Sequence, residues 1–287
     1  MSPGYLELLR PANVTTAVAD VLAGSAVAGL GHPAALPWLI VSSACLYAGG
    51  VVLNDVFDRE IDRAERPERP IPSGRVAVAA AAWLGGGLLA AGAALAWFAT
   101  SEAGLIAVAI AGLVLLYDAW GKRHPLVGPM NMAACRALNL LLGVAAVPAA
   151  LSRYWPVAAI PWLYIWAVTT LSRGEVHGGS RRSATAALIS LTAALAALIY
   201  IAIGAGALAP VAVVLAGVIG WRVVPPFAAA WKRPTPGTIR LAVKRGVLSL
   251  VLVDAAIAAA FGDPILSAAI LGTGVIAAWL ARRFAVT

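Results

Sequence analysis

The residues best suited to chemistry lie in one short stretch, residues 54–62, with the sequence NDVFDREID. It follows an apolar segment that ends near Leu53, so its acids lie where a membrane helix would leave the bilayer. At 3.6 residues per turn, Asn54, Asp58 and Asp62 are expected on one face of a helix, with Asp55 on its flank. Carboxylate and amide oxygens suit Mg²⁺ or Mn²⁺, and Mg²⁺ often completes its shell with substrate phosphates. The stretch therefore predicts a site for a metal-bridged diphosphate at the membrane surface.

Cations for such a diphosphate are close by in the chain. The same segment supplies Arg59, Arg63, Arg66, Arg69 and Arg75, and guanidinium groups bind phosphate oxygens well. The alternative is that these arginines only set the topology of a membrane protein. Topology requires basic residues but not a helical stripe of acids, so we favour the diphosphate interpretation.

Two further polar segments follow, residues 117–124 (YDAWGKRH) and 173–177 (RGEVH). Lys122 and Arg123 are candidate diphosphate contacts or ordinary loop cations, and Tyr117 is a candidate proton partner or a wall for a cation. Glu175 and His177 suggest a second metal site only weakly. Neither Cys nor His shows the spacing of zinc ligands.

Polar residues also occur inside apolar segments, where they are costly and are functional candidates by default. Asn13 and Asp20 lie in the first such segment, and Arg136 and Asn139 are three residues apart in the fifth. Arg136 needs an acid, carbonyl groups or a bound anion. A structural ion pair with Asp20 or Asp254 and a role in substrate binding are equally open from the sequence.

Composition predicts an integral-membrane protein. Of the 287 residues, 61% are apolar and 12% are charged, which is about half the charged fraction of soluble proteins. The net charge of +8 does not indicate nucleic-acid binding, because the basic residues are divided among short loops. Cys45 and Cys135 lie in apolar runs, so we expect buried thiols and no disulfide. No signal peptide is evident at the start of the chain.

The fold class that we expect is all-α, a polytopic bundle that forms one integral-membrane domain over residues 1–287. Ten apolar segments approach the length of about 20 residues that crosses a bilayer. They are residues 12–31, 36–54, 77–99, 103–120, 126–151, 155–172, 184–204, 207–224, 239–260 and 264–282. Abundant Gly and Ala in them permit close helix packing.

The distribution of charge predicts the orientation in a cell membrane. With the N-terminus inside, every Lys and Arg except Arg136 and Arg153 falls on the inner side. Both termini and all three polar segments are then cytoplasmic. Three polar segments at one end of a helical bundle suggest a cavity with a polar mouth and an apolar interior.

Residues 54–62 resemble the NDxxDxxxD signature of the UbiA superfamily of intramembrane prenyltransferases. Residues 10–13 (RPAN) resemble the start of its first helix, and residues 66–74 (RPERPIPSG) resemble the loop after the signature. Residues 116–123 resemble the Tyr and Lys-Arg loop of the family, and residues 136–143 (RALNLLLG) resemble its fifth helix. The resemblance runs in order from about residue 10 to residue 180. The family normally has nine membrane helices, so the prediction is nine to ten.

The resemblance implies Mg²⁺-dependent transfer of a prenyl group from a polyprenyl diphosphate to an unidentified acceptor. It implies that Asn54 and Asp58 bind Mg²⁺ with support from Asp55 and Asp62. The other residues that the resemblance implies act on the diphosphate or on the reaction: Asn13, Arg59, Arg63, Tyr117, Lys122, Arg123 and Arg136. The partners implied are the prenyl donor, the acceptor and the lipid bilayer, with no nucleic acid.

One departure concerns the second motif of the family, DxxxD. The corresponding loop, residues 172–179 (SRGEVHGG), has one carboxylate, so a second metal site requires Glu175 together with Asp118. The loop resembles that of the EboC-like branch of the superfamily. The departure keeps an alternative open, a non-catalytic isoprenoid-binding or transport protein. Alcohol phosphotransfer to a CDP-linked lipid is excluded, since it needs a longer motif with Gly and Arg between its acids.

Overall fold

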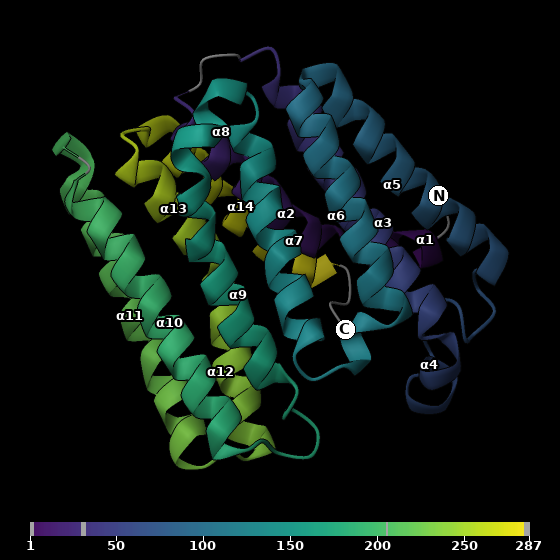
Figure 1. The fold of residues 1–287 in the computed structure, drawn as a ribbon. Helices are drawn as coiled ribbons and strands as arrows, with labels where there is room; N and C mark the ends of the chain where they lie inside the picture. Colours follow the sequence, from purple (N-terminus) through teal and green to yellow (C-terminus); the bar gives the residue numbers. More distant parts are fainter. Residues whose placement is uncertain (1–2, 30–32, 205, 284–287) are drawn as a thin grey trace.

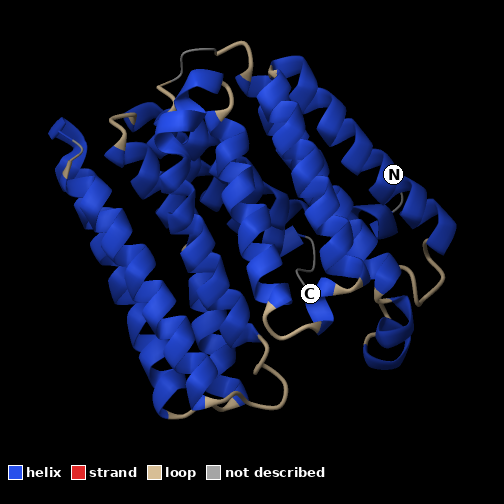
Figure 2. Cartoon of the chain, in the orientation of Figure 1, coloured by secondary structure: helices blue, strands red, loops and turns tan. Residues whose placement is uncertain are grey.

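The computed structural model describes residues 3–29, 33–204 and 206–283, and all regular elements in these ranges are helices (Figures 1 and 2). Three are short 3-10 turns, η1 Gly121–Arg123, η2 Trp155–Ala158 and η3 Gly206–Leu208. The α-helices are α1 Pro3–Leu9, α2 Pro11–Val27, α3 Leu36–Phe57, α4 Arg59–Glu65, α5 Val78–Ala99, α6 Ser101–Ala119, α7 Val127–Val144, α8 Pro148–Tyr154, α9 Ala159–Ser172, α10 Arg181–Ile203, α11 Ala209–Lys232, α12 Pro236–Leu248, α13 Leu250–Ala260 and α14 Pro264–Arg283.

The all-helical prediction is confirmed for the described residues, and helices cover all ten predicted segments. The end of the first segment, residues 30 and 31, lies outside the described ranges. Within the described ranges, six helical segments are long and apolar enough to cross a bilayer: α3, α5, α6, α10, η3 with α11, and α14. The prediction of nine to ten membrane helices is therefore not confirmed by length and hydropathy.

Several predicted boundaries were wrong. The fifth segment divides into α7 and α8, and the ninth divides at Ser249 into α12 and α13. The eighth was predicted to end before Pro225, but α11 continues through Pro225 and Pro226 to Lys232. Prolines are tolerated inside helices that neighbouring helices support. Arg222, which the prediction counted on the inner side at the end of the eighth segment, therefore lies well before the end of α11.

Helix α2 packs closely on α7 near the middle of the bundle. A Cβ atom added at Gly24 would lie 2.0 Å from the carbonyl oxygen of Leu140, and one added at Gly143 would lie 2.2 Å from that of Val21. The two backbones thus approach so closely that only glycine fits at both positions. The contact fixes α7, which carries Arg136 and Asn139, against α2, which carries Asp20.

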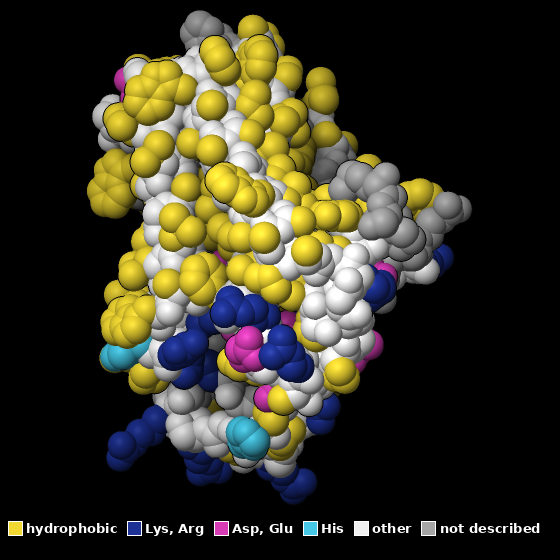
Figure 3. All heavy atoms as spheres, turned by 90° about the vertical axis from the view of Figure 1, so that its right-hand side faces the viewer, with side chains coloured by type: hydrophobic (Ala, Val, Ile, Leu, Met, Phe, Trp, Pro, Cys, Tyr) yellow, Lys and Arg dark blue, Asp and Glu magenta, His cyan; other side chains and the backbone are white. Residues whose placement is uncertain are grey.

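Charged side chains gather toward one end of the bundle. On the face drawn in Figure 3, most Lys, Arg, Asp and Glu side chains lie in the lower part, whereas hydrophobic side chains cover most of the upper part. Figure 1 places α4 and the α6–α7, α9–α10 and α11–α12 connections at that lower end. Segments far apart in the sequence are thus collected at one polar end.

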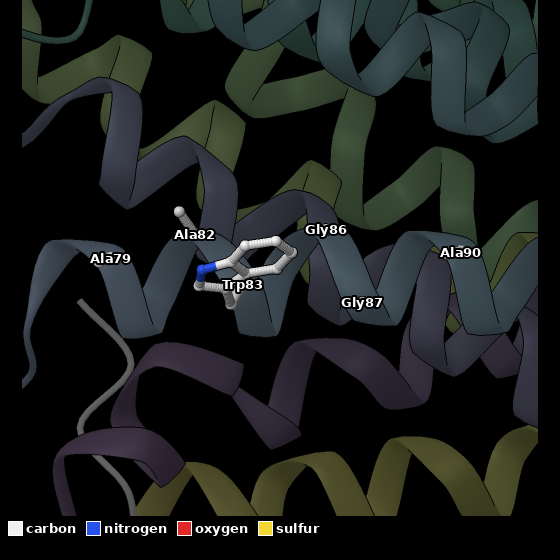
Figure 4. A pocket seen from close by; sticks show the side chains of 6 residues that line it. All are labelled: Ala79, Ala82, Trp83, Gly86, Gly87 and Ala90. Atoms are coloured by element: carbon white, nitrogen blue, oxygen red, sulfur yellow. The ribbon is translucent and has the colours of Figure 1, made fainter.

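The outer surface of α5 is apolar and open. A shallow hollow on it is lined by Ala79, Ala82, Trp83, Gly86, Gly87 and Ala90 (Figure 4). The side chain of Trp83 stands on this surface with 83% of its area exposed. No charged residue lines the hollow, so we assign it to the lipid-facing surface of a membrane helix and not to the functional site.

Candidate functional site

The candidate metal ligands of the stretch 54–62 form two sets, Asn54 with Asp58 and Asp55 with Asp62. Helix α3 ends at Phe57, Asp58 has a non-helical backbone with φ −90° and ψ 3°, and α4 begins at Arg59. The prediction that Asn54, Asp58 and Asp62 share one face is wrong for Asp62, because Asp62 and Asp55 both contact Arg69. Seven helical residues return to within about 20° of the starting direction, whereas eight overshoot by about 80°.

The first set joins the end of α3 to the end of α6. Asn54 Nδ2 donates a 2.8 Å hydrogen bond to Asp118 Oδ1, and Asp58 Oδ1 lies 2.7 Å from Lys122 Nζ. Asp118 is buried, whereas the side chains of Asp58 and Lys122 keep 21% and 13% exposure. We call Asn54, Asp58, Asp118 and Lys122 the oxygen cluster. It combines hard oxygen ligands with one cation, and it opens toward the polar end.

The second set holds the acidic stretch in place. The Arg69 guanidinium lies 2.7 Å from Asp62 and 3.4 Å from Asp55, and Arg10 lies 2.7 Å from Asp55. Asp55, Asp62 and Arg69 are all buried. Because Asp55 and Asp62 are paired with arginines, we assign them a structural role, which is to hold the helix ends that carry the oxygen cluster. Arg10 and Arg69 were not predicted as their partners.

Arg10 adopts an unusual backbone conformation where α1 meets α2. Its φ of 44° is positive, which no other non-glycine residue in the described ranges shows. A left-handed backbone costs an L-residue about 1–2 kcal/mol. The ion pair with Asp55 offsets part of that strain and aims the guanidinium at the acidic stretch.

The oxygen cluster fits Mg²⁺ in ligand type. Asp118 Oδ2 is buried and receives no hydrogen bond from the described residues, so an acceptor oxygen is available for a cation. In the described ranges, no group of three or more His, Cys, Asp or Glu side chains is arranged as a metal site. The cluster offers two carboxylates and one amide, so a cation held there would keep several waters or phosphate oxygens in its shell, as Mg²⁺ does.

The predicted diphosphate contacts lie at different depths. Arg59 and Arg63 are exposed and pair with Glu60 on α4, and Arg123 is exposed in η1. Lys122, by contrast, is nearly buried within the oxygen cluster. Tyr117 lies in the last turn of α6, next to Asp118 in the chain. Lys122 is therefore the best placed of the predicted cations.

Arg136 lies instead in a buried network between α2 and α7. Its Nε lies 2.9 Å from Asp20 Oδ2, and its Nη1 and Nη2 donate to Thr16 Oγ1 and to the Thr16 carbonyl oxygen. This geometry favours the ion pair over a diphosphate role. Asn13 is half-buried in the first turn of α2, and its carbonyl oxygen accepts a bond from the Thr16 hydroxyl.

Glu175 lies in the α9–α10 connection. Burial raises the pKa of its carboxyl, and the positive charge of Arg240 on α12 acts in the opposite direction. The same connection contacts η1, because Arg173 donates a 3.2 Å hydrogen bond to the Lys122 carbonyl oxygen. Pairing of Glu175 with Asp118 in one metal site stays a prediction.

Asn131 on α7 is a residue that sequence reasoning missed. It is 4% exposed, its Nδ2 has no hydrogen-bond partner in the described ranges, and its Oδ1 accepts a 3.5 Å contact from Cys135. A buried asparagine in an apolar segment was the available signal.

Comparison with known proteins identifies the family. The model of the UbiA prenyltransferase family matches residues 14–236. The chain belongs to the UbiA prenyltransferase family. This UbiA protein is 33% identical over 263 residues to the digeranylgeranylglyceryl phosphate synthase of Halobacterium salinarum, covering 85% of this chain and 93% of that one.

Other UbiA relatives match over a shorter length. The digeranylgeranylglyceryl phosphate synthases of Thermococcus kodakarensis and Ignicoccus hospitalis are 38% and 37% identical to this chain. The alignments cover 50% and 61% of this chain, and they span 52% and 57% of the relatives' own length. Because the EboC-like branch is not tested by these matches, it stays a prediction.

Solved structures share the UbiA fold. A structure described as concerning digeranylgeranylglyceryl phosphate synthase in membranes has a TM-score of 0.70 at 22% identity, covering 91% of this chain and 99% of that one. A UbiA homologue from Archaeoglobus fulgidus, bound to DMAPP and Mg²⁺, has a TM-score of 0.62 at 17% identity, covering 96% and 98%. The fold and the membrane character of the protein are thereby established.

Proposed function

We propose that this protein is an Mg²⁺-dependent intramembrane prenyltransferase that ionises a polyprenyl diphosphate and transfers the prenyl group to an acceptor. The observation that carries the proposal is the oxygen cluster, in which two carboxylates and an amide lie beside one lysine. A diphosphate needs both kinds of partner, a divalent cation and protein cations.

Asn54, Asp58 and Asp118 are the residues that would hold Mg²⁺, which supplies positive charge against the leaving diphosphate. Lys122 contacts Asp58 and is placed to bind a diphosphate oxygen next to that ion. Asp62 and Asp55 keep the acidic stretch in position through Arg69. The apolar bundle excludes water from the allylic carbon. The ring of Tyr117 can stabilise positive charge there.

The relatives suggest where to look for the two substrates. Matched UbiA homologues from Archaeoglobus fulgidus are bound to DMAPP or GPP with Mg²⁺, so the proposed donor is a prenyl diphosphate. The matched synthases are named for digeranylgeranylglyceryl phosphate. A glyceryl phosphate lipid is therefore the first acceptor to test.

The proposed arrangement is a single integral-membrane domain over residues 1–287 with nine to ten membrane helices. Its termini and polar segments face the cytoplasm. The segregation of basic residues supports this orientation. Both the oxygen cluster and Glu175 then lie at the inner side of the membrane, where the diphosphate head of the donor would bind.

A second candidate is a non-catalytic isoprenoid-binding or transport protein. The observation that favours it is the single carboxylate of the loop at Glu175, which leaves the family's second acidic motif incomplete. Such a protein binds the prenyl diphosphate with Mg²⁺ but does not release diphosphate from it.

Product formation tests the proposal directly. The purified protein in lipid vesicles is supplied with geranylgeranyl diphosphate, Mg²⁺ and a glyceryl phosphate lipid, and the extract is analysed by mass spectrometry. We expect an acceptor heavier by one prenyl group, formed with Mg²⁺ and not with EDTA. Metal-dependent binding of the donor without any prenylated product would favour the second candidate.

A further inference from the structure

A second buried ionic group lies away from the oxygen cluster, between α2, α7 and α13. Asp20 is fully buried, and its Oδ2 meets both Arg136 Nε at 2.9 Å and Asn139 Nδ2 at 2.8 Å. Asp254 on α13 is 2% exposed, and its Oδ2 lies 3.8 Å from Arg136 Nη2. Two carboxyl groups thus share one guanidinium inside the bundle.

Each carboxyl group has an oxygen without a donor. Asp20 Oδ1 and Asp254 Oδ2 are both buried, and neither receives a hydrogen bond from a donor group in the described ranges. Both carboxyl groups lie against the same guanidinium, that of Arg136. Two ionised carboxylates are both acceptors, so neither can satisfy the free oxygen of the other unless one of them carries a proton.

The charge count leads to the same conclusion. Two ionised acids and one arginine leave one negative charge uncompensated inside an apolar bundle, and buried unpaired charges are strongly disfavoured. We propose that Asp20 and Asp254 form a proton-binding site that holds one proton at neutral pH. With that proton the group of Asp20, Arg136 and Asp254 is neutral.

The geometry indicates which acid carries the proton. Asp20 accepts the close contacts from Arg136 and Asn139, so it is the ionised partner of the guanidinium. Asp254, which is farther from Arg136, carries the proton and donates it to Asp20. The proton thereby links α13 to α2 and, through Arg136, to α7.

Among the described residues, the other nearby cations do not compensate this charge, because Arg10 is paired with Asp55 and Arg222 lies nearer to Tyr164. Tyr47 on α3 faces Asp20 and Arg136, and Tyr164 on α9 faces Asp254. Arg222 on α11 acts on Tyr164, and Tyr164 donates its hydroxyl hydrogen to the Gly246 carbonyl oxygen. The two tyrosines are neutral at physiological pH and leave the charge count unchanged.

Infrared spectroscopy of the purified protein at neutral pH tests the proposal. The difference spectrum between wild type and Asp254→Asn should contain the carbonyl-stretch band of a single protonated carboxylic acid, which shifts in D₂O. Asp20→Asn should lose the same band, because Asp254 then ionises to pair with Arg136. Asp263→Asn, the same change in the α13–α14 connection, should retain it.

Stability supplies a second readout. The amide of Asp254→Asn can donate to Asp20 as the protonated acid does, so its Tm should stay close to the wild-type value, and Asp254→Leu should lower it clearly. Equal infrared spectra for wild type and both Asn variants would overturn the proposal. A second result would also overturn the proposal: the band is absent, and Na⁺ raises the Tm of the wild type but not that of Asp254→Asn. The site would then bind sodium instead of a proton. If one Asn variant does not fold, the other decides.

Discussion

Asp58 and Lys122 form an ion pair in which Oδ1 and Nζ lie 2.7 Å apart. It connects the cap of α3 to the 3-10 turn after the neighbouring helix α6. The residues expected to hold a metal and those expected to hold a diphosphate are thereby brought together. Asn54 and Asp118 form a parallel link between the same two helices. The proposed prenyl transfer depends on these two contacts, because they place the metal ligands next to the lysine.

Lys122 should contribute more to diphosphate binding than the exposed arginines. Lys122→Met removes a nearly buried cation, and a charge-assisted hydrogen bond contributes about 1.5–3 kcal/mol. We therefore expect the Kd for geranylgeranyl diphosphate to rise about 10- to 100-fold in an equilibrium binding assay. Arg63→Met, which removes an exposed guanidinium paired with Glu60, is the matched control. An equal effect of both changes would contradict the placement of Lys122.

Asp118 should be a metal ligand, whereas Glu175 should not be needed if one Mg²⁺ binds. Asp118→Asn removes the charge but keeps the size of a side chain bonded to Asn54. We expect the Mg²⁺ concentration for half-maximal diphosphate binding to rise on the order of 10-fold or more. Glu175→Gln should leave it within about 2-fold. If both variants shift the metal requirement equally, Glu175 belongs to a working second site.

Arg69 should be a structural residue. It pairs with the buried acids Asp55 and Asp62, and removing one partner of a buried ion pair costs about 3–5 kcal/mol. Arg69→Met should therefore lower the Tm of the purified protein substantially, even without ligand. Arg66→Met changes an exposed arginine three residues away and should leave Tm nearly unchanged. A wild-type Tm for Arg69→Met would refute the supporting role.

The crossing of α2 and α7 should not tolerate a methyl group. Gly24→Ala would place its Cβ 2.0 Å from a backbone oxygen, and backbone atoms cannot rotate away. Overpacking costs about 1–3 kcal/mol even where side chains can move, so we expect the upper end of that range or more. The control is Gly86→Ala on the open surface of α5, where a Cβ meets nothing within 4 Å. Thermal unfolding should separate the two variants clearly.

The pair of Glu7 and Arg75 should give a small pH dependence. Two hydrogen bonds of 2.8 and 2.7 Å from Arg75 lower the pKa of Glu7. The stability contribution is therefore fully present above the unfolded pKa of about 4.3 and is lost as pH falls through the lower folded value. Because the pair is partly exposed, we expect less than about 1 kcal/mol. Glu7→Gln should flatten the dependence of Tm on pH below about pH 5, and Glu65→Gln should not.

Much of the fold could be predicted from the sequence because membrane helices leave a strong signal in apolar runs. The ion pair of Arg136 with Asp20 was also one of the open alternatives, since a buried arginine needs a counter-charge. The helix ends were harder. Two consecutive prolines usually terminate a helix of a soluble protein, but α11 continues through both Pro225 and Pro226.

The partners inside the site could not be predicted from spacing. Arg10 meets Asp55 across 45 residues of sequence, and no periodicity encodes that contact. Asp55 and Asp62 share a side because seven residues make nearly two full helical turns, whereas the predicted spacing of four and eight residues drifts away from one side. Asp118 was noted as unusual, yet only the packing of α3 on α6 explains why it meets Asn54.

Ionisation of the donor can be measured as release of diphosphate from geranylgeranyl diphosphate by the purified protein in lipid, with a glyceryl phosphate acceptor present. Wild type is compared with Asp58→Ala and with Glu60→Ala, a change of an exposed acid on α4. We predict release that requires Mg²⁺, falls on the order of 10²-fold or more in Asp58→Ala, and persists in Glu60→Ala. If the wild type neither releases diphosphate nor binds the donor in a metal-dependent way, the assignment of residues 54–62 to a diphosphate site is contradicted.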